Sequence, residues 1–253
     1  KWQTSKVQNM TGMLEGCTEL RDFECKNWDT SSLKFTTSMF SACTHLKEID
    51  LRPFNARSII DMDFMFRFCR DLERVNLDTW ITPNLKRMLG VFEGCYSLRG
   101  LWWSSMLTGE VVTMSRLFKE CYALREVDLK HLDTTKVQDF SLMFNECSRM
   151  KKIDVGQFNL GSAVCLTGMF SNCEELTFLD VARWEVGTVR IFEEMFKHCI
   201  NLIYLDVANW DVRSGERFNE MFWGCWKLMK LELGEWRVLN AHDLSFMFSE
   251  CYQ

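Results

Sequence analysis

Ten cysteines recur at a fixed interval of 26 residues, and this period constrains the fold more than any other feature of the chain. We call them the ladder cysteines, and we call each 26-residue unit a rung, named by the ladder cysteine that begins it. A period of about 20 to 50 residues is typical of repeat arrays, in which each unit packs only on its neighbours. The ladder cysteines are Cys17, Cys43, Cys69, Cys95, Cys121, Cys147, Cys173, Cys199, Cys225 and Cys251.

Other apolar residues keep the same register. Phenylalanine stands three residues before nearly every ladder cysteine, leucine three residues after most of them, and tryptophan or phenylalanine often eleven residues after. In the stretch Leu202–Val207, the residues six and eight after the ladder cysteine, Leu205 and Val207, would share one face, which is the alternation of a strand. The residues before Cys121 follow another spacing, since Val111, Met114, Leu117 and Phe118 would share one face of a short helix.

We therefore predict an α/β repeat fold, a single solenoid domain over residues 1–253 with about ten rungs. A parallel sheet would form one face and short helices the other. The chirality rule for strand crossovers predicts a right-handed solenoid. Both ends fall inside a rung, so we expect them to be uncapped.

The repeat resembles the 26-residue bacterial surface-protein repeat, a relative of the BspA-like leucine-rich repeats. The pattern M-F-x-x-C-x-x-L-x-x-L-D-[LV]-x-x-W-[DN] is present over Met195–Asp211 and covers essentially the whole chain in register. The resemblance implies a leucine-rich-repeat solenoid with adhesive or protein-binding roles, mostly on cell surfaces, and no enzymatic activity. The Cys95 rung departs most from the pattern, because Trp102 replaces the acid, Trp103 the aliphatic residue and Met106 the tryptophan. A bulge or a special contact is expected there.

Composition and charge argue against several classes of function. The net charge of -5 disfavours binding to nucleic acid, and no apolar run is long enough to span a membrane. The four histidines occupy four different places in the repeat, and no catalytic or phosphate-binding motif is present. We therefore predict no enzyme activity and no cofactor.

The cysteine ladder has two chemical interpretations besides packing, namely metal binding and disulfides between rungs. No C-x-x-C pair is present, so a metal site is not predicted. Side chains in register would point the same way instead of toward each other, which disfavours disulfides. We expect buried free thiols that act as small apolar side chains.

Seven residues after most ladder cysteines stands a carboxylate that would face solvent on the strand surface. We expect a solvated acidic row that discourages edge aggregation. Bridging by divalent cations and recognition of a partner are the alternatives. The members of this row are Glu24, Asp50, Asp128, Asp154, Asp180, Asp206 and Glu232, with Asn76 and Trp102 at the two interruptions.

The strand surface becomes apolar in the last rungs. Earlier rungs carry mostly charged residues at the same places in the repeat. An exposed apolar cluster beside carboxylates is typical of a recognition site for a basic protein partner. A neighbouring segment covering the cluster is the alternative. We predict that the binding patch consists of Phe178, Ile203, Tyr204 and Met229, extended by Ile200 and Trp226 at its rim and accompanied by Asp180, Asp206 and Glu232.

These features predict a non-catalytic, adhesive or protein-binding module whose partners dock on the strand face. A structural scaffold within a larger assembly is the alternative. The location predicted for the first function is the cell surface or the extracellular space, and for the second the cell interior. Open ends also predict end-to-end association or membership of a longer array.

Overall fold

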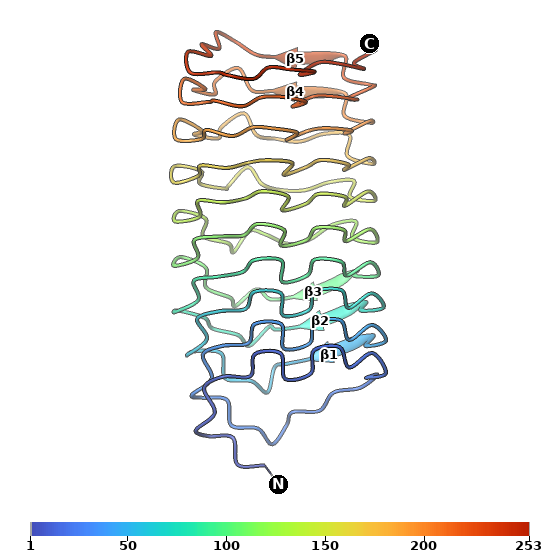
Figure 1. Cartoon of the computed structure of the whole chain (residues 1–253), viewed down its shortest axis with the longest axis vertical. Helices are drawn as coiled ribbons and strands as arrows, with labels where there is room; N and C mark the ends of the chain where they lie inside the picture. The colour runs from blue at the N-terminus through green and yellow to red at the C-terminus, as the bar shows by residue number, and fades with distance from the viewer. Residues whose placement is uncertain (1, 253) are drawn as a thin grey trace.

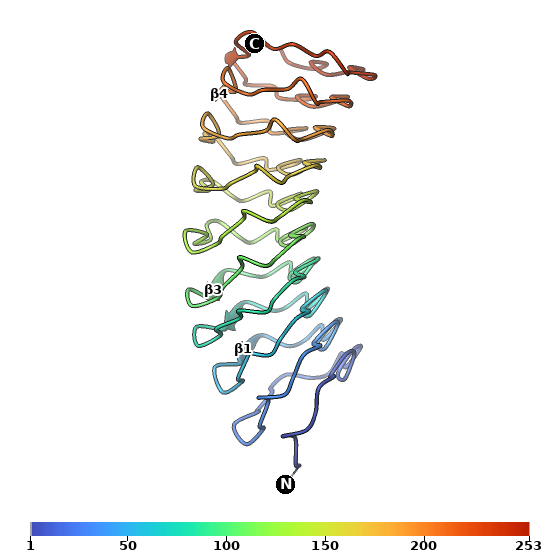
Figure 2. The ribbon, with the colours of Figure 1, turned by 90° about the vertical axis from the view of Figure 1, so that its left-hand side faces the viewer.

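The rungs stack on one another from the N-terminus to the C-terminus (Figures 1 and 2). The computed structural model of the protein describes residues 2–252. An unbroken series of parallel bridges joins residues 26 apart, beginning with Asn9–Phe35 and ending with Arg217–Asp243. These bridges lie eighteen residues after each ladder cysteine. Successive rungs are thus hydrogen-bonded in parallel register, as the repeat predicts.

Short strands form where the alternating pattern predicts them. They are β1 (Glu48–Asp50), β2 (Arg74–Asn76), β3 (Gly100–Trp102), β4 (Tyr204–Asp206) and β5 (Lys230–Glu232). The first three pair in parallel as one sheet, and β4 pairs in parallel with β5. The strands lie along the left edge of the stack in Figure 2. The predicted parallel pairing is confirmed, but the sheet is not continuous, because no strand forms between β3 and β4.

The predicted short helices are wrong, since residues 2–252 contain no helix. Each rung instead has residues with positive φ five and one positions before its cysteine, such as Phe64 (58°) and Phe68 (58°) in front of Cys69. An α-helix cannot pass through such left-handed residues. The segment forms consecutive turns, in which the amide of Met65 donates to the carbonyl of Met62 and that of Cys69 to the carbonyl of Phe66.

Alternate amides of this segment bond to the next rung. Phe64 donates to Leu89 at 2.7 Å, and Phe66 donates to Val91 at 2.9 Å. The consecutive turns bury Met62, Met65, Phe66 and Cys69 with the i, i+3, i+4, i+7 spacing of a helix. A helical spacing of apolar residues therefore arises here without a helix, because turns about four residues long repeat along the segment.

The core consists of columns of equivalent side chains. The phenylalanine rings three before the ladder cysteines stack from rung to rung, with ring centroids 5.5 Å apart for Phe40 and Phe66. The indole N–H of Trp80, eleven after its cysteine, donates to the carbonyl of Leu51 in the preceding rung at 2.8 Å. Trp184, Trp210 and Trp236 repeat this bond at 2.9 Å. The tryptophan column thus stabilises the stack by packing and by hydrogen bonds to buried carbonyls.

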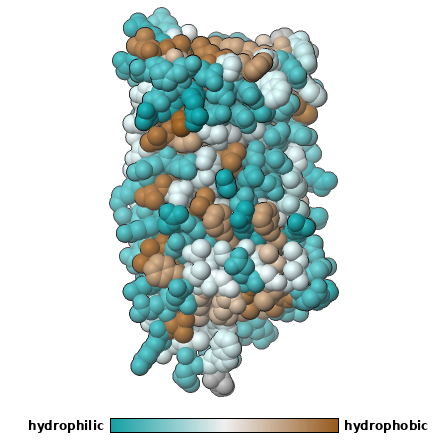
Figure 3. All heavy atoms as spheres, in the orientation of Figure 1, coloured by the Kyte–Doolittle hydropathy of each residue, from teal (hydrophilic) through white to brown (hydrophobic). Residues whose placement is uncertain are grey.

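The surface shown in Figure 3 lies on the side of the stack away from the strands. Hydrophilic residues cover much of it, and apolar residues appear in separate small groups.

Candidate binding surface

The residues of the predicted patch lie on adjacent strand segments. Phe178 pairs with Tyr204 in a parallel bridge, and Tyr204 pairs with Lys230 between β4 and β5. The exposed fractions are 56% for Phe178, 45% for Ile203 and 70% for Met229. Tyr204 is half-buried. The geometry therefore brings the aromatic and aliphatic members together on one face.

The remaining patch residues differ in their solvent exposure. Trp226 is exposed and Ile200 is half-buried. Asp180 is exposed, whereas Asp206 and Glu232 are half-buried. Asp206 pairs in register with Glu232, which Lys230 contacts at 2.7 Å. The ammonium of Lys230 also lies 5.5 Å from the centre of the Tyr204 ring.

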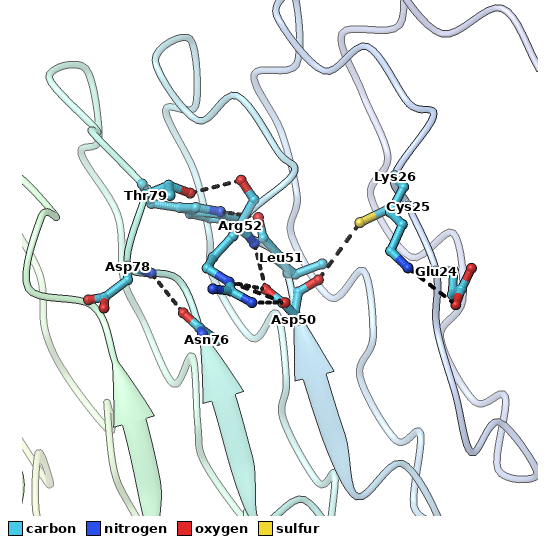
Figure 4. Close-up of polar contacts among 10 residues, drawn as sticks. Glu24, Cys25, Lys26, Asp50, Leu51, Arg52, Asn76, Asp78 and Thr79 are labelled. Atoms are coloured by element: carbon cyan, nitrogen blue, oxygen red, sulfur yellow. Dashed lines mark hydrogen bonds and ion pairs between the residues drawn. The ribbon is translucent and has the colours of Figure 1, made fainter.

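The acidic row has a structural role. The Oδ1 atom of Asp50 accepts the amide of Arg52 at 3.1 Å, which caps the turn after the strand. Asn76 does the same for Asp78 without a charge (Figure 4). Asp128, Asp180 and Asp206 cap equivalent turns. These four capping carboxylates are thereby held in a fixed orientation on the strand face.

Charge compensation divides the acidic row into two parts. Near the N-terminus, Glu24 pairs with Lys26 at 3.7 Å and Asp50 pairs with Arg52 at 2.7 Å (Figure 4). The Arg52 guanidinium lowers the pKa of the Asp50 carboxyl through a hydrogen bond. In the middle, within the described residues, no ion pair forms at four consecutive members of the row, Asp128, Asp154, Asp180 and Asp206.

The neighbouring residues explain this difference. Lys26 and Arg52 stand nine residues after their cysteines, whereas Gly156, Ala182 and Ala208 occupy that place in the later rungs. In the Cys121 rung, Lys130 donates its backbone amide to Asp128, but its ammonium forms no ion pair in the described structure. Asp180 and Asp206 therefore lack a strand-face cation in their own rungs.

Trp103 interrupts the sheet between the two groups of strands. In regular rungs the amide eight after the cysteine donates to the next rung, as from Leu51 to Asn76 at 3.0 Å. At Trp103 the indole N–H, in place of the backbone amide, donates to the equivalent carbonyl, that of Asp128, at 2.9 Å. Its buried ring packs edge-on against Phe118, with centroids 5.7 Å apart. This is the special contact expected in the Cys95 rung.

The interruption opens a hollow of about 820 Å³ on the strand face. Exposed Trp102 and Phe178 are among its lining residues, and half-buried Val127 and Ile153 are apolar members of the lining. The equivalents of Val127 and Ile153 are buried in four other rungs, at Ile49, Val75, Leu179 and Leu205. Within the described residues, no amide of 126–129 or 152–155 donates to a backbone carbonyl. The hollow therefore exposes apolar side chains together with unpaired peptide groups.

The hollow has charged lining residues of both signs. They are the carboxylates Glu126, Asp128, Asp154 and Asp180 and the cations Arg99, Lys130 and Lys152. Because Phe178 and Asp180 belong both to the hollow and to the predicted patch, the two features form one continuous surface. Sequence reasoning predicted the exposed apolar residues but missed the hollow, whose only signal was the unusual tryptophan pair at Trp102 and Trp103.

The ladder cysteines are mostly buried free thiols, as predicted. Each thiol from Cys43 onward donates to the carbonyl three before the preceding ladder cysteine, as from Cys69 to Phe40 at 3.0 Å. Cys17 is exposed and Cys251 is half-buried, so the prediction of burial fails at the two ends. Burial raises the pKa of Cys43 to about 11 and that of Cys121 well above the ordinary range.

Residues 2–252 contain no group of three or more histidine, cysteine, aspartate or glutamate side chains placed to hold a metal ion. They also contain no helix of the length and apolarity needed to cross a membrane.

Comparisons with solved structures give low sequence identities. A leucine-rich repeat protein from Bacteroides ovatus is 18% identical, with a TM-score of 0.39, over 94% of this chain and 72% of that one. A leucine-rich cell surface protein from Faecalibacterium prausnitzii is 16% identical, with a TM-score of 0.41, over 89% and 69%. An internalin from Listeria monocytogenes is 15% identical, with a TM-score of 0.32, over 99% and 76%. No curated protein matches the chain.

A protein-family comparison covers the whole chain. The family described as "Mycoplasma protein of unknown function, DUF285" matches residues 1–101, 61–177 and 164–253. This match confirms the predicted family resemblance.

Proposed function

The chain belongs to the DUF285 family of Mycoplasma proteins, and from its strand face we propose that it is a non-catalytic module that binds other proteins. The observation that carries this proposal is the apolar cluster at Phe178, Ile203 and Met229, which is exposed although the equivalent residues of earlier rungs are mostly charged. Exposed apolar groups of this kind are typical of interaction sites. Aromatic side chains such as Phe178 and Tyr204 supply large contact areas at low entropic cost.

The rigid mounting of the patch supports the proposal. Phe178 is tied to Tyr204 by a bridge, and the neighbouring core residues Leu179 and Leu205 are buried. A surface fixed by its scaffold loses less entropy on binding than a mobile loop does. We further propose that the module forms one right-handed solenoid domain on the cell surface, in line with its resemblance to surface repeats.

The test uses peptides selected against the wild-type protein from a random-sequence phage library. We expect the selected peptides to bind the wild-type protein at least tenfold more tightly than the double variant Phe178→Ser, Tyr204→Ser. Circular dichroism should show that the variant remains folded, because both residues lie outside the buried columns. Equal binding to the wild-type protein and the folded variant would refute the patch.

A structural scaffold is the second candidate function. The observation that favours it is the mode of stacking, since each rung offers backbone groups to the next and a further rung or a second copy can continue the series. End-to-end association belongs to this alternative. Sedimentation velocity at micromolar concentration separates the two, because a monomer supports the binding module and stable larger assemblies support the scaffold.

A further inference from the structure

We propose that the surface from the hollow to the patch binds an extended, basic segment of a partner protein. This inference rests on the proposed protein-binding function and adds the chemistry and shape of the bound segment. It starts from the four members of the acidic row that form no ion pair, which we call the open carboxylates: Asp128, Asp154, Asp180 and Asp206.

Charge complementarity identifies the partner as basic. Elsewhere in the acidic row, Asp50 and Glu232 are paired within their own rungs by Arg52 and Lys230. Within their own rungs, Asp180 and Asp206 lie between Phe178 and Tyr204 on one side and Ala182 and Ala208 on the other. The Lys230 ammonium of the next rung contacts the Glu232 carboxylate. Since Asp128, Asp180 and Asp206 are already oriented by capping bonds, a cation from outside needs little reorganisation of the site.

Lys230 shows how a cation can occupy this surface. Its ammonium lies 5.5 Å from the centre of the Tyr204 ring and 2.7 Å from the carboxylate of Glu232. A lysine or arginine of the partner would use Phe178 and Asp180 in the same combination of aromatic face and carboxylate. Phe178 is more than half exposed, so its ring is accessible to such a side chain.

The shape of the surface indicates an extended segment. The open carboxylates stand on four successive rungs, so they cover three steps of about 4.8 Å, or roughly 14 Å. An extended chain advances about 3.3 Å per residue, so four or five residues reach from Asp128 to Asp206. Apolar side chains of the same segment would fit against Trp102, Val127 and Ile153 in the hollow.

The test measures binding of fluorescein-labelled hexa-arginine, with hexa-citrulline as the uncharged probe of similar shape. We expect the wild-type protein to bind hexa-arginine at least tenfold more tightly than hexa-citrulline at 50 mM salt. The triple variant Asp154→Asn, Asp180→Asn, Asp206→Asn should lose this preference. The variant should remain folded, because Asn76 caps the equivalent turn in its own rung.

The matched single variants are Asp180→Asn and Asp50→Asn, which remove the same charge from the same row. Asp180→Asn should weaken hexa-arginine binding about threefold, and Asp50→Asn should leave it unchanged because Asp50 is already paired with Arg52. Equal effects of the two variants, or equal binding of the two probes, would overturn the inference.

The proposed function and this inference can fail separately. If library peptides need Phe178 and Tyr204 but are not basic and bind the triple variant normally, the inference fails and the proposed function stands. If they bind the double serine variant as tightly as the wild-type protein, the proposed function fails. A neutral oligosaccharide that competes with hexa-arginine equally on the wild-type protein and the triple variant would also count against a basic peptide.

Discussion

The hydroxyl of Thr134 donates to the carbonyl of Asn159 at 3.0 Å and accepts the amide of the same residue at 2.8 Å. Thr30, Thr82 and Thr108, which stand at the same place in other rungs, make the same reciprocal contact with the next rung. All four threonines are buried. In each of these four rungs, one small side chain thus satisfies both peptide groups of a residue in the next rung, at a point where no sheet forms.

Replacing Thr134 with valine should destabilise the protein by about 1–2 kcal/mol, because both Asn159 backbone groups would lose their partner in a part-buried contact. Urea denaturation followed by circular dichroism measures this change. The control is Thr177→Val on the exposed strand face, where Ile203 and Met229 stand in the next rungs. If the two variants prove equally stable, the hydroxyl of Thr134 contributes no net stability.

Replacing Ala42 with glycine should stabilise the protein. Its φ is 58°, a left-handed conformation that disfavours residues with a side chain by about 1–2 kcal/mol. Glycine avoids this strain but loses more conformational entropy on folding, so we expect Ala42→Gly to stabilise the protein by about 0.5–1 kcal/mol. The control Ala123→Gly, at a residue without positive φ, should destabilise by a similar amount. Thermal unfolding of both variants checks this, and a loss of stability at Ala42 would contradict it.

Trp103 and Met106 should be energetically coupled. Trp103→Leu alone removes a large buried side chain and its bond to Asp128, and should destabilise by about 3–5 kcal/mol. Adding Met106→Trp restores the usual pattern of the rung and should recover at least half of this loss. A double-mutant cycle by urea denaturation measures the coupling. Strictly additive effects would show that the two side chains do not share one space.

The buried thiols should make the protein sensitive to alkali. Burial raises the pKa of Cys43 from 9.0 in an unfolded chain to about 11. The folded state therefore binds the proton more tightly, so the thiol's contribution to stability is complete below about pH 9 and declines as the pH rises toward 11. The urea midpoint should fall over this interval, and it should fall less steeply in Cys43→Ala. Parallel curves for the two proteins would refute this assignment.

Exposure should also decide which thiols react. Cys17 is the exposed ladder cysteine of the described chain, whereas Cys95 is fully buried. A thiol reagent at pH 8 should modify Cys17 in the folded protein and reach Cys95 only after denaturation, because the reactive thiolate needs access and a low pKa. Peptide mapping by mass spectrometry identifies the modified residues. Rapid modification of Cys95 in the folded state would mean that the stack opens readily.

The sequence period predicted much of this architecture but not its local conformations. The buried columns of Phe66 and Cys69 follow directly from the spacing, since every unit must pack on an equivalent one. The absence of helices could not be read from that spacing, because consecutive turns bury Met62, Met65 and Phe66 at helical intervals. Long-range bonds from alternate amides to the next rung favour the turns, and a single repeat does not reveal those bonds.

The binding surface was predictable in part for a similar reason. The apolar residues around Phe178 are visible as departures from the repeat. The hollow depends on the bond between the Trp103 indole and the Asp128 carbonyl, which joins residues of different rungs. The isolation of Asp180 could have been found by comparing Arg52 with Ala182, the residues nine after their cysteines.

The fixed offset of the inter-rung bonds ties every rung to the same 26-residue register. Leu51 donates to Asn76 and Val207 donates to Glu232, in each case 25 positions ahead. Deleting one whole 26-residue repeat would leave every remaining donor opposite an equivalent acceptor. Deleting a single residue would instead displace the following buried side chains from their columns until a compensating insertion restored the register. Changes in length that preserve this fold are therefore multiples of the repeat, or are confined to the places where rungs are not bonded to each other.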